Sequence, residues 1–394
     1  MTRKEFIKIC GALGIVLPVA PSLLASNLND KSDKRGLNRK VIIIGAGPAG
    51  LSSGYLLNQQ GIDFEIIEAS AHYGGRIRHN TEFTDFPIPL GAEWLHSDLS
   101  EFDKIVNDPS VQITTKMQEY SKSDTIGYFD EGTYAETTEG WFGVDEDLKF
   151  KGSSWMAFFE EYIVPSVQDK IILNAPVTSI NYEGDEVIIT TQKGKMYKGD
   201  EVIVTVPIQI LKDGDIEFTP SLPKSKLEVL KEAYIWGGMK VFIEFSKKFY
   251  PTFLTLHNSH TVNGQQLYYD AAYGQNSKSN ILGLFLVGLN AVDYQKKSDN
   301  ELKEYILKEL DGLYGGQASK YYVKHLVQNW SKEPYIRQAY LADYARARTS
   351  RILAKPIGNK VFFAGDAYTS FADWSSVHIA ARSAREAVSS ILEL

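Results

Sequence analysis

The stretch VIIIGAGPAG, residues 41–50, constrains the fold of this chain more than any other. Four β-branched residues in a row, Val41 to Ile44, predict a buried strand. Gly45, Gly47 and Gly50 follow at once with the spacing G-x-G-x-x-G. In such a turn the first glycine allows the bend, the second lets the backbone approach a pyrophosphate, and the third lets the following helix pack on the strand.

The next 18 residues complete a βαβ unit. Leu51 to Gln60 predicts a helix, Asp63 to Ile67 a second strand, and Glu68 lies at the end of that strand. All these parts fall within about 30 residues, as a dinucleotide site requires, with the helix N-terminus facing the phosphates and the acid facing a ribose. The predicted contacts are Gly45, Gly47, Pro48, Ala49, Gly50, Glu68 and Ala69.

Composition excludes several other classes of protein. The chain has 394 residues, enough for two domains, and a net charge of -7. It contains no long basic run, so we expect no nucleic-acid partner. The one cysteine, Cys10, cannot build a disulfide framework or a Cys-rich metal site, and we expect no metal.

Later segments resemble the flavin-containing amine oxidase superfamily. The motifs are EASAHYGGRI after the ribose acid, LGAEWLHS (90–97), NAPVTSI to DEVIVTVPIQIL (174–211), NWSKEPYIRQAY (329–340), and VFFAGDAY with DWSSVHIAARSAREA (361–387). They follow the order of the family and span nearly the whole chain after its opening segment. Ser70 and His72 stand where arginines are common, and Asp366 replaces the usual glutamate.

The resemblance implies an α/β fold with two domains. The Rossmann-like FAD domain would be discontinuous, and a mixed domain of sheet and helix would bind the substrate. The implied limits are 39–97, 168–218 and 330–394 for the FAD domain and 98–167 and 219–329 for the substrate domain. In the latter we expect strands at Met239–Phe245, Gln266–Tyr273, Ile281–Leu289 and Tyr321–Trp330, and a helix at Glu301–Leu313.

The resemblance also implies bound FAD and assigns further contacts to it. Because no cysteine follows residue 10, a cysteinyl link cannot form and the FAD would be noncovalent. A C-terminal helix beginning near Trp374 would direct its first amides at the flavin ring and stabilise negative charge there. The implied contacts are Gly75, Arg76, Gly91, Ala92, Val177, Trp330, Gly365, Asp366, Trp374, Ser376 and Val377.

Three residues are candidates for the reacting centre. The family places a lysine, here Lys240 in WGGMKVFIEF, where it binds flavin N5 through water. His96 stands where polyamine oxidases have a histidine near the substrate amine, and Tyr340 would flank the flavin. Each has a simpler structural alternative. Lys240 could be a strand lysine with its ammonium in solvent, His96 a buried histidine with its hydrogen bonds made inside the protein, and Tyr340 a core aromatic residue.

The implied reaction is FAD-dependent oxidation of a primary or secondary amine to an imine, with O2 as acceptor and H2O2 as product. One alternative is an amino-acid oxidase or another FAD-dependent dehydrogenase or desaturase of the superfamily. A second is a flavin-binding protein without oxidase turnover. The sequence names neither the substrate nor the oligomeric state.

The opening segment resembles a twin-arginine export signal. Arg3 and Lys4 precede a short apolar run, Ile9 to Ala20, which is far shorter than the roughly 20 residues of a membrane span. Lys4 takes the place of the second arginine. We expect residues 1–26 to be the signal and 27–38 a linker, and the protein to reach the periplasm through the export machinery. The alternative is a basic N-terminal helix.

Overall fold

The computed structural model describes residues 39–130, 132–138, 147–256, 260–261, 263–342, 346–370 and 375–394. The predicted signal and linker (1–38) and Trp374 lie outside these residues. The described residues all belong to one compact unit by their contacts. Within the described residues no helix is both long enough and apolar enough to cross a membrane.

A five-stranded parallel sheet contains the predicted strand at its centre. The strand order is β10, β2, β1, β14, β24. Ile43 of β1 pairs with Ile66 on one side and Ile203 on the other, and both neighbours run parallel to it. The bounds are Lys40–Ile44 (β1), Asp63–Ile67 (β2), Ile171–Ile172 (β10), Glu201–Val204 (β14) and Val361–Phe363 (β24).

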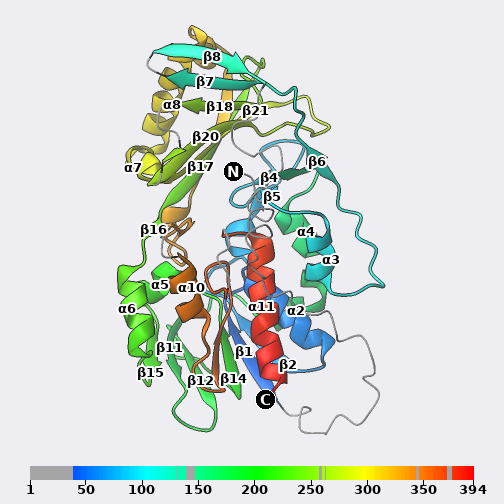
Figure 1. The fold of residues 1–394 in the computed structure, drawn as a ribbon, viewed down its shortest axis with the longest axis vertical. Coiled ribbons are helices and arrows are strands. Elements are labelled where there is room, and N and C mark those ends of the chain that lie inside the picture. Colours follow the sequence, from blue (N-terminus) through cyan, green and yellow to red (C-terminus); the bar gives the residue numbers. More distant parts are fainter. Residues whose placement is uncertain are drawn as a thin grey trace, which may run out of the picture. The chain divides into compact units, whose positions relative to one another are not determined.

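The two faces of this sheet belong to different cores because successive side chains of a strand point to opposite faces. Val41 and Ile43 pack with helices α2, α3, α4 and α11. Figure 1 shows α11, the last helix, beside α2. The bounds of these helices are Pro48–Gln59 (α2), Ser100–Val106 (α3), Trp155–Tyr162 (α4) and Val377–Leu392 (α11).

Ile42 and Ile44 pack on the opposite face, against a four-stranded sheet and three helices. The sheet has the order β13, β12, β11, β15. Its bounds are Val177–Asn181 (β11), Val187–Thr191 (β12), Met196–Gly199 (β13) and Glu217–Thr219 (β15). The helices are Ile208–Lys212 (α5), Lys224–Glu232 (α6) and Arg346–Ala354 (α10).

An eight-stranded sheet carries Lys240. Its main path is β22, β17, β21, β20, β18, β7, β8, and β19 pairs with β20. The bounds are Ile126–Asp130 (β7), Thr133–Thr137 (β8), Gly238–Phe245 (β17), Phe253–Leu256 (β18), His260–Thr261 (β19), Gly264–Asp270 (β20), Asn280–Gly288 (β21) and Tyr322–Asn329 (β22). Helices α7 (Leu289–Gln295), α8 (Asp299–Tyr314) and α9 (Gln317–Tyr321) pack against this sheet, and Figure 1 labels the first two.

The segment 98–167 contributes to both the eight-stranded sheet and the core of the parallel sheet. Strands β7 and β8 join the eight-stranded sheet, whereas Trp155, Phe158 and Phe159 of α4 pack in the core of the parallel sheet. The remaining short strands are His79–Asn80 (β3), Ile88–Pro89 (β4), Trp94–Leu95 (β5), Met117–Glu119 (β6), Leu148–Phe150 (β9), Ile235–Trp236 (β16) and Tyr340–Leu341 (β23). The segment thus packs partly in the core of the parallel sheet and partly with the eight-stranded sheet. The predicted domain limits stay a prediction.

Three element ends differ from the predictions by three residues, and the other predicted ends differ by two residues or fewer. Helix α2 starts at Pro48 instead of Leu51, since proline at the first helical position already has the helical φ. Strand β20 ends at Asp270, before a turn, and not at Tyr273. Helix α11 starts at Val377 with Ser376 as its N-cap, three residues after the predicted start near Trp374.

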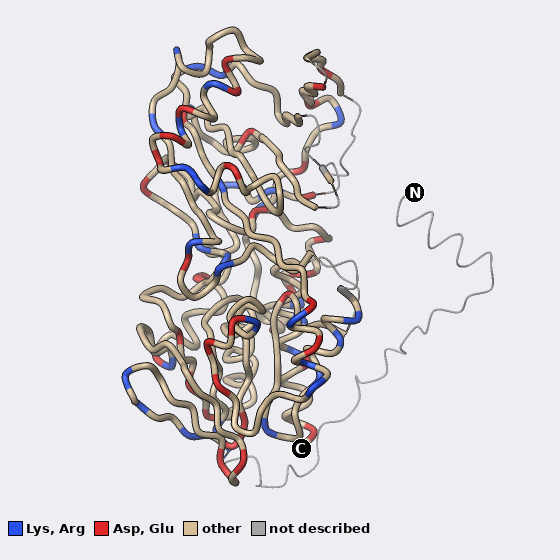
Figure 2. The backbone as a smooth tube through the Cα atoms, turned by 90° about the vertical axis from the view of Figure 1, so that its left-hand side faces the viewer, with Lys and Arg blue, Asp and Glu red and all other residues tan. Residues whose placement is uncertain are grey.

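Both charge signs are distributed over the described chain. Figure 2 shows lysine and arginine interspersed with aspartate and glutamate along the backbone. Ion pairs such as Lys198–Glu186 and Lys170–Asp63 join the two signs at the surface.

Candidate active site

One cavity of about 810 Å³ brings the predicted residues together. Its walls include the residues just after β1, β2, β14 and β24, at the carboxyl ends of the parallel strands, and residues of the eight-stranded sheet. Ligands bind at this edge in open α/β sheets. The predicted residues that line the cavity are Gly45, Gly47, Pro48, Ala49, Glu68, Ala69, Gly75, Arg76, Gly91, Ala92, His96, Val177, Lys240, Trp330, Tyr340, Gly365, Asp366, Ser376 and Val377.

Gly50 is the described candidate that does not line the cavity. A Cβ at this position would lie 1.9 Å from the carbonyl oxygen of Gly45. Gly50 therefore packs α2 against the turn after β1. Gly47 differs from it, because no heavy atom lies within 4 Å of where its Cβ would be. Gly47 thus lines open space at the start of α2.

Glu68 is fixed by the turn that it faces. Its carboxylate accepts hydrogen bonds from the backbone N–H of Ala46 at 2.7 Å and of Ser70 at 2.8 Å. Gly45, with φ of 102°, donates its own N–H to Ile67 at the end of β2. The sequence motif therefore places one carboxylate at a defined point of the cavity wall.

Two helix N-termini border the same cavity. Neither α2 nor α11 has a side-chain cap or an acidic residue in its first turn. A helix N-terminus favours negative charge, so the cavity suits a ligand with an anionic group at each of two points. The open space at Gly47, the fixed Glu68 carboxylate and these two helix ends fit a flavin dinucleotide.

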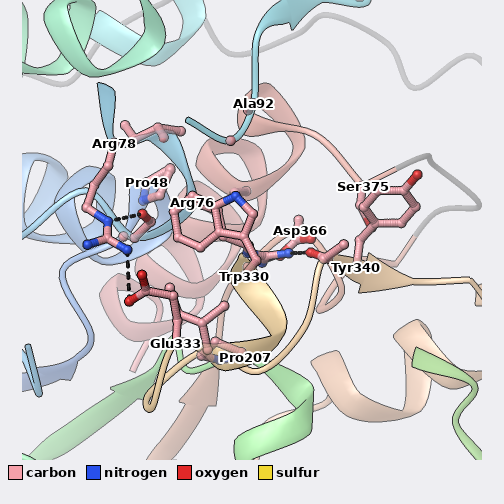
Figure 3. A pocket seen from close by; sticks show the side chains of 18 of the residues that line it. Pro48, Arg76, Arg78, Ala92, Pro207, Trp330, Glu333, Tyr340, Asp366 and Ser375 are labelled. Atoms are coloured by element: carbon pink, nitrogen blue, oxygen red, sulfur yellow. Dashed lines mark hydrogen bonds and ion pairs between the residues drawn. The ribbon is translucent and has the colours of Figure 1, made fainter. Parts of the chain in front are cut away.

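The motifs around Gly75 and Gly91 interlock. Ala92 donates its N–H to the Arg76 carbonyl at 3.0 Å, and a Cβ on Gly91 would lie 1.8 Å from the same oxygen. The Arg76 guanidinium pairs with Asp366 at 2.6 Å and also donates to the carbonyl of Ala339. Figure 3 shows the Arg76–Asp366 pair at the cavity wall. These contacts join four of the predicted motifs.

Trp330 and Tyr340 belong to the same wall (Figure 3). The Trp330 indole donates to the Leu90 carbonyl at 2.9 Å, and the Arg78 guanidinium lies 4.9 Å from its ring centroid. Arg78 also pairs with Glu333 at 3.0 Å. Tyr340 packs near Trp236, with 5.7 Å between ring centroids. Both aromatic residues are thus held by neighbours outside their own motif.

Lys240 is buried, and its partner is Glu93. The Lys240 ammonium lies 2.7 Å from one Glu93 carboxylate oxygen, and the Lys149 ammonium pairs with the other. Burial lowers the pKa of Lys240, the Glu93 carboxylate partly opposes this, and Lys149 lowers it further. Burial acts to raise the pKa of Glu93, but the two lysines outweigh it and bring that pKa to about 2.

The sequence reasoning missed Glu93 and Lys149. Glu93 lies in the motif LGAEWLHS, but the motif does not indicate which residues pair with its carboxylate. Lys149 comes from β9, which pairs with β5 so that Lys149 lies opposite Trp94. No secondary structure was predicted around Lys149, and a lysine there is ordinarily expected at the surface, yet Lys149 is 3% exposed.

His96, which follows β5, has a partner just before the strand that pairs with β5. Its Nδ1 lies 2.7 Å from an Asp147 carboxylate oxygen, and both residues line the cavity. Asp147 directly precedes β9, so the segment 98–167 supplies partners for both Glu93 and His96. Nothing in the sequence pointed to Asp147. Within the described residues, no group of three or more potential metal ligands is found.

Comparison with known proteins places this geometry in a family. Residues 43–108 match the NAD(P)-binding Rossmann-like domain, and residues 127–392 match the flavin containing amine oxidoreductases. Two solved structures share the fold, each over 90% of this chain and 99% of its own: putrescine oxidase bound to putrescine (TM-score 0.74) and cyclohexylamine oxidase from Brevibacterium oxydans (TM-score 0.72). Both are 17% identical to this chain.

Curated relatives are similarly distant in sequence. Lysine-specific histone demethylase 1B of Mus musculus is 24% identical over 84% of this chain, and polyamine oxidase 3 of Oryza sativa subsp. japonica is 23% identical over 89%. The chain spans about half the length of the mouse demethylase, of which it covers 50%. It covers 89% of the rice polyamine oxidase. The match over residues 127–392 covers most of the chain, and the chain therefore belongs to the family of flavin-containing amine oxidoreductases.

Proposed function

We propose that this protein is an FAD-dependent oxidoreductase that converts a primary or secondary amine to an imine, with O2 as electron acceptor and H2O2 as product. One observation carries the proposal: a single cavity is lined by the dinucleotide turn, by Glu68 and by Lys240 of the other sheet. A bound dinucleotide and a small substrate could therefore meet inside it. The membership of the family supports the same chemistry.

The residues divide the work by position. FAD, when bound, supplies the capacity to accept two electrons from the substrate carbon. The N-termini of α2 and α11 would hold its anionic groups, and Glu68 a ribose. Lys240 would lie between the flavin and the substrate, and strand β17 would hold its backbone in a fixed position. Trp330 and Tyr340 would exclude water and orient the amine.

His96 would accept a hydrogen bond or a proton from the substrate amine. A neutral His96 that donates from Nδ1 to Asp147 keeps an unprotonated Nε2, which can accept a hydrogen bond or a proton. An amine must lose its proton before oxidation because the nitrogen lone pair has to be available. The His96–Asp147 pair offers both an acceptor and a nearby negative charge for a cationic substrate.

The charges of the cavity favour an amine over an amino acid. A substrate carboxylate would need an arginine that is not already neutralised. Of the described residues, two arginines line the cavity, and both are paired: Arg76 with Asp366 and Arg78 with Glu333. Arg337 does not line it and pairs with Asp213 and Asp215. The amino-acid oxidase alternative is therefore less well supported.

The test is anaerobic mixing of the purified yellow protein with a panel of amines and amino acids. We expect an amine to bleach the flavin absorbance, O2 to restore it, and H2O2 to appear in the solution. Bleaching by amino acids alone would replace the proposal with the oxidase alternative. No bleaching by any plausible donor would indicate a flavin-binding protein without turnover.

We also propose that the protein is exported to the periplasm in the folded state. The proposal rests on Arg3, Lys4 and the apolar run Ile9 to Ala20, and on the need to load a dinucleotide before export.

A further inference from the structure

A buried cluster of charges lies at the cavity wall. Glu93 is 2% exposed, Lys240 2% and Lys149 3%. Tyr269, which is fully buried, donates its hydroxyl to the same Glu93 oxygen that Lys240 contacts. Two lysines share one carboxylate, so the cluster carries one excess positive charge in a place where charge is costly.

The cluster joins three separate segments of the chain. Glu93 precedes β5, Lys149 lies on β9, and Lys240 lies on β17, where it pairs with Phe285 of β21 and Gln328 of β22. Lys149 and Lys240 therefore lie on paired strands, and Glu93 lies directly before one. Glu93 and Lys240 line the cavity, whereas Lys149 does not. The carboxylate thus stands between an inner lysine and a lysine of the cavity wall.

Aromatic rings complete the surroundings of Lys240. Its ammonium lies 5.2 Å from the ring centroid of Trp94, 5.5 Å from that of Tyr269 and 5.7 Å from that of Phe242. These faces attract a cation but provide no charge to balance it. The counter-charge of Lys240 is therefore Glu93.

We propose that Glu93 is a positioning residue, which fixes the Lys240 ammonium at the cavity wall in its charged form while Lys149 holds the other end of the carboxylate. The kinetic consequence rests on the proposed function, because it needs an amine that reduces the flavin. The electrostatic consequence does not.

The pKa of Lys240 should report the role of Glu93. That pKa already lies below its ordinary value of 10.5, first because of burial, and the Glu93 carboxylate limits the drop. Tyr120 interacts electrostatically with Glu93 and Tyr269, and its own pKa is raised first by burial and then by the charges of Glu93, Asp147 and Asp270. Removing the Glu93 charge should therefore lower the pKa of Lys240 further.

The main experiment measures thermal unfolding of the holoprotein at two pH values. In Glu93→Gln, two cations face each other without a counter-charge near pH 7, and we expect the unfolding midpoint to fall by roughly 5 °C or more. An unfolded lysine keeps its ordinary pKa, so stability is lost as pH falls below that value toward the depressed pKa of the folded state. The deficit of Glu93→Gln should therefore be smaller at about pH 10 than near pH 7.

Three further variants separate charge from shape. Glu93→Asp keeps the charge, so its deficit should be nearly the same at both pH values. Lys149→Met in the Glu93→Gln background removes one of the two facing cations and should recover part of the midpoint near neutral pH. Glu186→Gln changes an exposed glutamate, 55% exposed and 2.9 Å from Lys198, and should have almost no effect. A Glu93→Gln deficit that is equal at both pH values, without rescue by Lys149→Met, would show that Glu93 only fills space.

The second readout is the pH profile of anaerobic flavin reduction by a substrate amine. Glu93→Gln should move the limb that reports Lys240 toward lower pH, and Lys149→Met alone should move it toward higher pH, because a like charge is removed. If Glu93→Gln does not fold, the Lys149→Met shift still decides the matter, and an unmoved profile overturns the positioning role. If the wild type oxidises no amine, the proposed function fails, while the unfolding series still tests Glu93.

Discussion

At the scale of single residues, Glu68 combines two tasks. Its carboxylate faces the cavity and also accepts the N–H groups of Ala46 and Ser70. We expect Glu68→Ala to weaken FAD binding by about 1.5–3 kcal/mol, or roughly 10- to 150-fold in Kd, since a hydrogen bond to a charged group is lost. Glu68→Gln keeps an acceptor and should lose less. The measurement is FAD titration of the stripped protein, and equal affinity in all three proteins would contradict the assignment.

Removing the charge of Lys240 should leave the buried cluster of Glu93, Lys149 and Lys240 electrically balanced. In Lys240→Met the Glu93 carboxylate keeps Lys149, so one negative and one positive charge remain. We therefore expect a folded, yellow protein in which flavin reduction or reoxidation is slowed at least about tenfold, equivalent to about 1.4 kcal/mol of barrier. Stopped-flow absorbance measures both half-reactions.

The matched control for this variant is Lys226→Met. Lys226 is also 2% exposed, but its ammonium donates to the backbone carbonyls of Ile352 and Leu353 and it does not line the cavity. Its loss should affect stability and leave the flavin rates unchanged. Wild-type rates in Lys240→Met would leave Lys240 with a structural role only.

The sequence predicted single residues where a motif defines their surroundings. Glu68 and Arg76 occur at fixed offsets from glycines, so their places on the cavity wall could be predicted. Glu93 and Lys149 are 56 residues apart, and only the pairing of β5 with β9 brings them together. Asp147 is another such case. A buried charge becomes recognisable only when its partner is known.

At the scale of elements, α2 depends on two glycines with different tasks. Gly47 has φ of -77°, which alanine adopts easily, and its Cβ would meet no atom within 4 Å. A Cβ on Gly50 would collide with the Gly45 carbonyl. We expect Gly47→Ala to keep the unfolding midpoint of the stripped protein but to bind FAD poorly, because the methyl group occupies the space of a pyrophosphate.

Gly50→Ala should behave in the opposite way. It forces α2 away from β1, so the midpoint should fall by several degrees even without FAD. Thermal unfolding of the stripped proteins and FAD titration separate the two effects. Equal loss of stability in both variants would contradict this division of roles.

Elements were predictable where local chemistry fixes their limits. The strand Asp63–Ile67 was predicted with the limits that the structure has. The helix around Glu301–Leu313 was predicted within two residues of α8, which begins with a capping box at Ser298 and ends at Gly315 with φ of 59°. The start of α11 was predicted three residues too early, near Trp374, whereas the N-cap is Ser376, whose side chain makes no capping hydrogen bond.

At the scale of the whole molecule, the cavity is assembled from distant parts of the chain. Strand β24, near the C-terminus, pairs with β14, and Asp366 just after it holds Arg76. Residues 39–68 and 361–394 must therefore both be in place before a dinucleotide can be enclosed. The interlocking of these segments could be expected from the order of the motifs, whereas the divided packing of 98–167 could not.

The proposed export in the folded state is compatible with this assembly. A chain threaded unfolded would arrive without FAD, which is bound only after both ends have met. We expect Arg3→Lys to leave a yellow, folded protein in the cytoplasm with its N-terminus uncut, because Lys4 already replaces the second arginine and neither position of the pair would then hold an arginine. Cell fractionation with flavin fluorescence of each fraction measures this. Lys4→Arg is the matched control, which completes the pair and should be exported at least as well as the wild type. Export of Arg3→Lys at the wild-type level would refute the twin-arginine interpretation and leave a general secretory signal or an N-terminal anchor in its place.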